Sequence, residues 1–243
     1  MRFKEMALLG EESWLKSQYY DWLERKRDID FKREEARWIS YIVMRNGDRD
    51  RSKSWSASSL GGCERRQEFV YLNMKPQGHS VQTRNIFANG DYMHMRHQVA
   101  GLMQGYLTDV EVPIEVDKYR LRGTLDGLCS DGSVVDFKSM NSRGFNNLEE
   151  PYPSHINQLH GYMFAQGASH GRMVYECKDT QRIKEFAVKF ETATWEALAE
   201  SLDRMNQDMD NKTLAAPLDP GSFDCRFCQF TRKCRTTNFE DLV

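Results

Sequence analysis

Two acids and a lysine on neighbouring strand-like segments constrain this 243-residue chain more than any other feature. Asp126 lies in the segment 119–129, and Asp136 and Lys138 lie in the segment 133–140. A buried carboxylate destabilises a fold unless it is paired or coordinates a cation. A divalent metal ion shared by the two acids would remove that cost, so the segments predict a metal site on a sheet.

The two-residue period of a strand makes this arrangement testable. Asp136 and Lys138 are two residues apart, so they share one face of the sheet. A two-residue loop at 131–132 would point Asp126 away from them, whereas a three-residue loop at 131–133 places it opposite Lys138 and diagonal to Asp136. Diagonal partners lie about 7 to 8 Å apart. We therefore predict the three-residue loop, or an equivalent bulge.

Further polar side chains on predicted helices support a site at this hairpin. Gln158 and Tyr162 are four residues apart, so one helix face presents both an amide and a phenol. His94, four residues after Gly90 on an earlier helix, would add an imidazole to the metal ligands. Carboxylates with one imidazole favour Mg²⁺ or Mn²⁺ over zinc.

In this order, the four short motifs resemble the PD-(D/E)xK nuclease superfamily, specifically its RecB-like branch. The pattern of that branch is G-x-x-x-H, G-x-x-D, D/E-x-K and Q-x-x-x-Y. In this chain the motifs run from Gly90 to His94, Gly123 to Asp126, Asp136 to Lys138, and Gln158 to Tyr162.

The resemblance implies an α/β fold with a restriction-endonuclease-like core, in which helices flank a mixed central sheet. It also implies metal ligands and catalytic residues. The implied metal ligands are His94, Asp126, Asp136 and the Phe137 backbone carbonyl, with Glu111 either behind these ligands or on a second metal ion. The implied catalytic residues are Asp126, Asp136, Lys138, Gln158 and Tyr162. Lys138 would orient water or stabilise developing negative charge.

Three cysteines crowd the end of the chain, at Cys225, Cys228 and Cys234. A tetrahedral thiolate site needs a fourth ligand, for which we choose Cys63. Four thiolates suit either zinc or an iron-sulfur cluster. Cys129 and Cys177 lie in apolar strand-like runs, and we expect them to be buried small side chains.

The spacing C-x-n-C-x2-C-x5-C is similar to that of two groups of iron-sulfur nucleases: AddB-type nuclease domains and the Cas-four-type CRISPR-associated exonucleases. The resemblance is also compatible with a phage-encoded homologue of these enzymes. The resemblance implies a structural 4Fe-4S cluster, with Zn²⁺ as the alternative, that ties the N-terminal and C-terminal segments together. It covers residues 56 to 236.

The resemblance implies a RecB-like nuclease domain over residues 56–243, and the pattern of apolar residues predicts the helices and strands of the chain. Residues 1–55 read as a helical N-terminal extension, and 46–62 as a polar linker ending at Cys63. We expect helices at 83–104, 154–168 and 194–211, and strands at 109–116, 119–129, 133–140, 172–177 and 183–190.

The charge balance excludes a globally basic nucleic-acid coat, because 34 Lys and Arg oppose 36 Asp and Glu. A local basic cluster nevertheless lies in the cysteine tail, where we expect contacts to DNA phosphates from Arg226, Arg232, Lys233 and Arg235. No apolar run reaches the roughly 18 residues of a membrane helix, and the N-terminus lacks the apolar core of a signal peptide. We expect a cytoplasmic protein, in the host cytoplasm if phage-encoded.

The sequence thus predicts a divalent-metal-dependent deoxyribonuclease, an exonuclease that acts on DNA ends or single strands. Two alternatives stay open. One is a non-catalytic DNA-binding or adaptor module with a four-cysteine zinc site, and the other is a structure-specific endonuclease with the same chemistry. Expected partners are DNA and proteins of recombination or CRISPR adaptation, and oligomers are compatible with the sequence.

Overall fold

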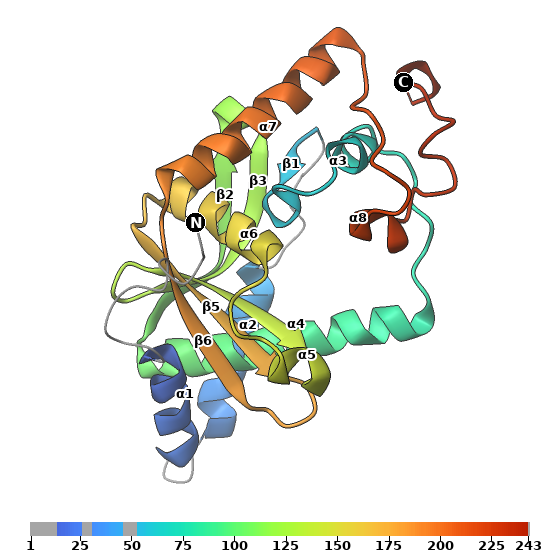
Figure 1. Cartoon of the computed structure of the whole chain (residues 1–243). Coiled ribbons are helices and arrows are strands. Elements are labelled where there is room, and N and C mark those ends of the chain that lie inside the picture. Colours follow the sequence, from blue (N-terminus) through green and yellow to red (C-terminus); the bar gives the residue numbers. More distant parts are fainter. Residues whose placement is uncertain (1–13, 26–30, 46–52, 243) are drawn as a thin grey trace.

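A mixed β-sheet forms the centre of the computed structural model, which describes residues 14–25, 31–45 and 53–242 (Figure 1). The strands are β1 (Trp55–Ser56), β2 (Leu107–Val116), β3 (Leu121–Cys129), β4 (Val134–Met140), β5 (His170–Cys177) and β6 (Ile183–Lys189). The α-helices are α1 (Trp14–Arg25), α2 (Phe31–Arg45), α3 (Glu64–Tyr71), α4 (Val81–Gln104), α5 (Ser142–Asn146), α6 (Pro153–Gln166), α7 (Thr192–Asn211) and α8 (Phe223–Arg226). Short 3-10 turns lie at Ala57–Ser59, Asp117–Tyr119 and Phe239–Asp241.

The sheet is organised around β3. Strand β2 pairs antiparallel with β3 along almost its whole length. The parallel β1 and the antiparallel β4 pair with opposite ends of β3, so these two strands share its other edge. Strand β5 then adds parallel to β4, and β6 adds antiparallel to β5. The sheet is therefore mixed, as predicted, and β3 and β4 diverge beyond a short ladder.

Helices cover both faces of the sheet (Figure 1). On one face, α6 and α7 pack Leu159 and Leu202 against strand residues that include Val134. On the other face, α1, α2 and α4 pack against strand residues that include Val135 and Phe137. Val134 and Val135 follow each other on β4 but pack on opposite faces, because successive side chains of a strand alternate between the two faces of the sheet.

The long helices and the strands beyond β1 lie where the hydrophobic period predicts them. Helix α4 begins at a cap, because Ser80 Oγ accepts a hydrogen bond from the Thr83 amide at 3.1 Å, and it ends at Gly105 in the left-handed conformation. The prediction of a polar linker over 46–62 was wrong for its later part. Residues 55–59 form β1 and a 3-10 turn that enter the core, while 46–52 lie outside the described residues.

The structure also contains helices that the hydrophobic pattern missed. Helices α3, α5 and α8 are eight residues long or shorter, and α8 lies in the cysteine-bearing tail. Of the residues 1–55 expected to form a helical extension, 14–25 and 31–45 form α1 and α2, whereas 1–13, 26–30 and 46–52 lie outside the described residues. These two helices contribute Leu15, Trp22 and Ile42 to the core cluster around Phe137. Within the described residues, no helix is long and apolar enough to cross a membrane.

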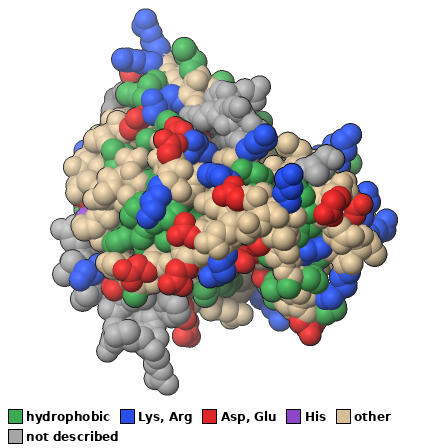
Figure 2. All heavy atoms as spheres, turned by 90° about the horizontal axis from the view of Figure 1, so that it is seen from above, with side chains coloured by type: hydrophobic (Ala, Val, Ile, Leu, Met, Phe, Trp, Pro, Cys, Tyr) green, Lys and Arg blue, Asp and Glu red, His purple; other side chains and the backbone are tan. Residues whose placement is uncertain are grey.

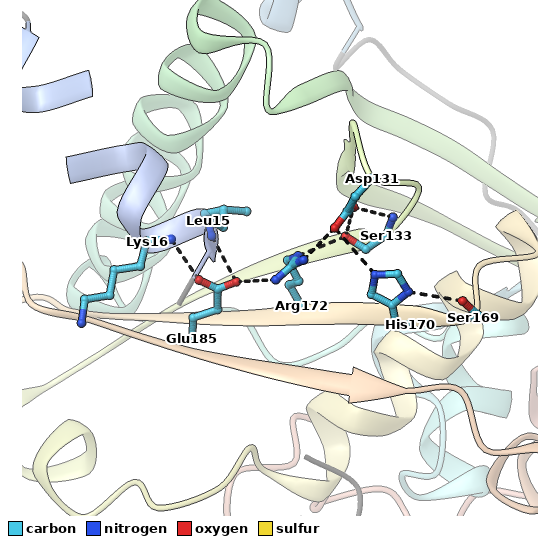
Figure 3. A network of polar contacts seen from close by, with 8 residues as sticks. All are labelled: Leu15, Lys16, Asp131, Ser133, Ser169, His170, Arg172 and Glu185. Carbon is cyan, nitrogen blue, oxygen red and sulfur yellow. Dashed lines mark hydrogen bonds and ion pairs between the residues drawn. The ribbon is translucent and has the colours of Figure 1, made fainter. Parts of the chain in front are cut away.

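The β3–β4 hairpin contains three loop residues, as predicted, but they are 130–132 rather than 131–133. The Cys129 amide donates to the Ser133 carbonyl at 2.8 Å, and Gly132 takes a positive φ of 84° that favours glycine. The Asp131 carboxylate accepts from the Ser133 amide at 2.9 Å and pairs with Arg172 of β5 at 2.6 Å. This side-chain network holds the shifted loop in place (Figure 3).

Candidate active site

The candidate site lies where β3 and β4 separate. Their ladder pairs Gly127 with Val135 and Leu128 with Val134, and counting on from these pairs puts Asp126 level with Asp136. The expectation that Asp126 lies opposite Lys138 was therefore off by two residues. The loop both begins and ends one residue earlier than predicted, and each of these changes moves the partner of Asp126 by one position. Beyond the ladder, the Phe137 amide donates to Asp126 Oδ2 at 2.7 Å. The Asp126 carboxylate thus takes the place of the β3 backbone carbonyl that would accept this bond in a continued ladder.

A chain of polar contacts connects Asp136 to helix α6. Lys138 Nζ lies 2.8 Å from Asp136 Oδ2, as expected for residues that share one face of a strand. Lys138 Nζ also donates to Gln158 Oε1 at 3.0 Å. The Gln158 amide in turn donates to the Tyr162 hydroxyl at 2.7 Å. The structure thus brings together four of the predicted catalytic residues and fixes the Lys138 ammonium group.

His94 of α4 reaches the same site from the other side of the sheet. Its Nδ1 lies 3.5 Å from Asp126 Oδ2. Burial opposes protonation of this imidazole, but the Asp126 carboxylate and then Asp136 raise the pKa of His94 to about 9. In return, burial opposes ionisation of Asp126, but His94 and Lys138 keep the pKa of that carboxyl below its usual range.

Asp136 is fully buried, and apart from the ion pair with Lys138 neither of its carboxylate oxygens accepts a hydrogen bond from the described residues. Burial raises the pKa of Asp136 to about 6, with Lys138 opposing the rise and the nearby Asp126 carboxylate adding to it. A buried carboxylate with free lone pairs is an expected ligand of a hard cation. The chemistry of these acids and the imidazole suits a divalent cation, and Asp126, Asp136 and His94 are the side chains that would hold it, although as described they are not grouped around one point as metal ligands.

Gln98 is a site residue that the motifs did not include. Its amide donates to Glu111 Oε1 at 2.7 Å and to the Asp126 backbone carbonyl at 2.9 Å. Glu111 is only 8% exposed and has a left-handed φ of 49°, an unusual conformation for a strand residue. Because Gln98 follows His94 by four residues, helical spacing alone could have indicated that both face the site.

The four predicted cysteine ligands line one pocket, which we call the cysteine pocket: Cys63, Cys225, Cys228 and Cys234. Cys129 and Cys177 are buried elsewhere, as expected. Across the described part of the chain, however, no three His, Cys, Asp or Glu side chains are grouped so that they could hold a metal ion as they stand. The structure thus places the thiols around one pocket without forming a metal centre.

Arg65 of α3 joins the N-terminal and C-terminal segments at the cysteine pocket. Its guanidinium donates to the backbone carbonyls of Cys234, Ala215 and Thr237 at 2.9, 2.7 and 2.7 Å. Three hydrogen bonds from one buried arginine therefore join α3 to the C-terminal segment. The cysteine pattern indicated this contact only indirectly, by grouping Cys63 with the three cysteines of the tail. The predicted DNA-contacting residues of the tail are all exposed: Arg226, Arg232, Lys233 and Arg235.

A mixed sheet thus carries two acids and a lysine where two of its strands diverge. In a comparison with protein families, residues 73–235 match the PD-(D/E)XK nuclease superfamily. This chain belongs to that superfamily, and membership implies DNA as the substrate. No curated protein matches the chain.

Solved structures with a similar fold include SSO0001, at a TM-score of 0.53 and 19% identity over 86% of this chain and 98% of that chain. LHK-Exo in complex with dAMP has a TM-score of 0.53 and 13% identity, over 67% of this chain and 90% of that chain. A second structure of LHK-Exo, an alkaline exonuclease from Laribacter hongkongensis, has a TM-score of 0.48 and 12% identity, over 73% and 93% of the two chains.

Proposed function

We propose that this protein is a divalent-metal-dependent deoxyribonuclease of the RecB-like branch that degrades DNA from ends or in single strands. The observation that carries the proposal is the buried Asp136 carboxylate, whose oxygens have no polar partner among the described residues other than the Lys138 ammonium group at 2.8 Å. The order of the four motifs along the chain supports the same function. LHK-Exo, a protein of similar fold, is an exonuclease and was solved with dAMP.

The residues of the site have separate tasks in this proposal. When bound, Mg²⁺ or Mn²⁺ supplies Lewis-acid chemistry, which activates water and stabilises charge on phosphate oxygens. Asp126, Asp136 and His94 hold the cation, together with the Phe137 carbonyl. Lys138 keeps a raised pKa, because Asp136 and Asp126 outweigh the effect of burial, so it stays charged and stabilises the negative charge that develops on phosphate.

Gln158 and Tyr162 act on Lys138 rather than on the substrate. Gln158 accepts a hydrogen bond from the Lys138 ammonium at 3.0 Å and is itself bonded to Tyr162 at 2.7 Å. A lysine side chain loses conformational freedom when it is held in this way before the substrate binds. In this proposal Glu111 orients the Asp126 backbone indirectly, because the Gln98 amide donates both to Glu111 and to the Asp126 carbonyl.

The test is cleavage of end-labelled linear DNA, single-stranded and double-stranded, with Mn²⁺ or Mg²⁺. Asp136→Ala and Lys138→Ala should each lower the rate by at least about a hundredfold, because each removes charge stabilisation from the transition state. Lys189→Ala, an exposed lysine at the end of β6, is the matched control and should cleave like wild type. Wild-type protein no more active than the two site variants would contradict the proposal.

Circular single-stranded DNA separates the exonuclease from the endonuclease alternative. An exonuclease needs a free end, so the circle should stay intact under conditions that degrade the linear strand of the same sequence. Cleavage of the circle at a comparable rate would instead favour the structure-specific endonuclease.

We also propose that the cysteine pocket holds a structural 4Fe-4S cluster. The support is that all four predicted ligands line this pocket, although they are not grouped as a metal centre in the described structure. Burial and the neighbouring thiols Cys234 and Cys228 raise the pKa of Cys63, whereas a bound metal requires its thiolate. Metal binding and closure of the tail are therefore expected to occur together.

Iron content and colour distinguish the cluster from zinc. Protein prepared without oxygen should be brown and contain iron, and Cys63→Ser should lose both, whereas Cys177→Ser should keep them because Cys177 lies outside the cysteine pocket. A colourless preparation with stoichiometric zinc would favour the adaptor alternative with a four-cysteine zinc site, particularly if it cleaves no DNA.

A further inference from the structure

A second pocket lies directly beside Lys138, and we call it the lysine pocket. Its lining includes Lys138 of β4, Tyr152 and His155 at the start of α6, Lys178 after β5, and Phe223 and Asp224 of α8. None of these residues other than Lys138 has a task in the proposed metal chemistry. The lysine pocket therefore needs an explanation of its own, since any substrate phosphate that reaches Lys138 lies next to it.

Two aromatic rings of the lysine pocket are exposed to solvent. The Tyr152 residue is 44% exposed and Phe223 is 73% exposed. Exposed rings beside a catalytic lysine are suited to stacking, because every nucleobase has an apolar face that an aromatic side chain can cover. The two rings come from different parts of the chain, since Tyr152 directly precedes α6 and Phe223 begins α8 in the cysteine-bearing tail.

The core wall of the pocket is held in place by hydrogen bonds. The Tyr175 hydroxyl accepts from the Tyr152 amide at 3.2 Å and lies 2.8 Å from His155 Nδ1. The Tyr152 ring packs edge-on against His155 at 5.5 Å. Ordering of this wall before a ligand arrives lowers the entropy cost of binding.

Charge in the lysine pocket favours an anion. Lys138 and Lys178 line it with only Asp224 as an opposing acid among the described lining residues. Lys138 is also paired with Asp136 at 2.8 Å behind the pocket wall, which leaves Lys178 and the other donors of Lys138 for an anion. Asp224 also lines the cysteine pocket, so the segment that carries the thiols is the segment that presents Phe223. An anionic ligand with an aromatic face matches both the charge and the rings.

We propose that the lysine pocket binds an unpaired nucleotide of a single DNA strand, with its base stacked on Tyr152 and Phe223 and its phosphate near Lys138 and Lys178. In a duplex the faces of each base are covered by its neighbours, so only an unpaired nucleotide offers a free face. Tyr152 and Phe223 are then substrate-positioning residues that select single-stranded DNA. This inference rests on the proposed nuclease function.

The test compares two single-stranded probes of equal length, an oligothymidylate and an abasic oligomer that has phosphates but no bases. Binding is measured by fluorescence anisotropy at low salt without metal, using full-length protein. Tyr152→Ala and Phe223→Ala should each weaken binding of the oligothymidylate by about tenfold, the scale of one base–aromatic stack, and leave abasic binding unchanged. Tyr152→Phe keeps the ring and should bind like wild type.

Phe227→Ala is the matched control for Phe223. Phe227 belongs to the same segment and is 81% exposed, but it does not line the lysine pocket. Because Phe223 and Phe227 are both largely exposed, their removal is not expected to unfold the protein. Unchanged oligothymidylate affinity in both pocket variants, equal losses on the two probes, or an equal loss in Phe227→Ala would each overturn the inference.

Cleavage measured in parallel keeps the two proposals apart. If wild type cleaves no DNA with Mn²⁺ but the binding pattern is as expected, the nuclease function fails and the nucleotide pocket stands. If wild type cleaves DNA and the pocket variants bind both probes like wild type, the nuclease function stands and the pocket inference fails.

Discussion

At the scale of single residues, the buried carboxyl group of Glu68 on α3 has an environment that disfavours its charge. The side chain is fully buried, and its Oε2 accepts a hydrogen bond from the Ala215 amide at 2.8 Å. Burial raises the pKa of Glu68 from 4.5 to about 7; the Ala215 amide opposes this rise and Asp208 adds to it. Protonated Glu68 is therefore the stable form of the folded state below neutral pH.

This raised pKa predicts a stability that falls as the pH rises. Between pH 4.5 and about 7 the folded state binds more protons than the unfolded state, so the free energy of unfolding decreases across that window. Glu68→Gln cannot ionise and keeps an acceptor for the Ala215 amide. We expect the variant to match wild type near pH 4 and to exceed its free energy of unfolding by about 3 kcal/mol at pH 8.

Urea unfolding at the two pH values checks this prediction. Glu196→Gln, an exposed glutamate on α7, is the control and should follow wild type at both pH values. An equal stability of Glu68→Gln and wild type at pH 8 would show that the Glu68 carboxylate is solvated or paired in the folded protein.

At the scale of elements, α1 is attached to the sheet through its first turn. The Glu185 carboxylate on β6 accepts hydrogen bonds from the Leu15 and Lys16 amides at 3.3 and 2.9 Å (Figure 3). Arg172 pairs with the same carboxylate at 3.0 Å, and its guanidinium lies 4.7 Å from the Trp14 ring centroid. Glu185 thus supplies the acceptor that the free amides of a helix start require.

Glu185→Ala should therefore loosen α1 specifically. The change removes both amide acceptors and leaves the buried Arg172 with fewer partners, which should lower the free energy of unfolding by about 3 kcal/mol. Hydrogen exchange should accelerate in residues 15–25 more than in β4 and β5. Lys189→Ala on the same strand is the control, and unchanged exchange of α1 in Glu185→Ala would contradict the role of this contact.

At the scale of the whole molecule, the net charge of -2 is an average over opposed parts. On the face seen in Figure 2, Lys and Arg side chains intermingle with Asp and Glu side chains rather than form one basic surface. The site itself concentrates carboxylates at Asp126 and Asp136, while the exposed basic residues of the tail lie elsewhere. Without a cation, the repulsion of DNA phosphates by the two acids opposes the attraction exerted by Lys138 and the protonated His94.

This distribution predicts a change in DNA affinity when one acid is neutralised. Asp136→Asn should abolish cleavage yet bind DNA about tenfold more tightly than wild type in the absence of metal, with an affinity that falls as salt is added. Fluorescence anisotropy with EDTA measures this effect. Glu115→Gln, a change at an exposed strand residue, should leave the affinity unchanged, and equal affinities of Asp136→Asn and wild type would refute the repulsion.

Sequence reasoning found those parts of the site that depend on local periodicity. Asp136 and Lys138 share a face because strand side chains alternate, and Gln158 and Tyr162 meet because helix residues four apart are neighbours. The same reasoning missed α3 and α5, since helices this short carry too few apolar positions to display a period. It also missed Gln98, whose partners Glu111 and Asp126 lie on two other elements.

By itself, the sequence determined the kind of fold and the chemical character of the site, because hydrophobic period and motif order are properties of neighbouring residues. Only the tertiary structure decided the exact register of the β3–β4 hairpin. There, Asp131 of the loop 130–132 pairs with Arg172 from β5, a contact between parts of the chain that are distant in sequence. The tertiary structure also decided that Phe223 and Lys138 line the same pocket. These residues are 85 positions apart, so their proximity depends on how the whole chain packs.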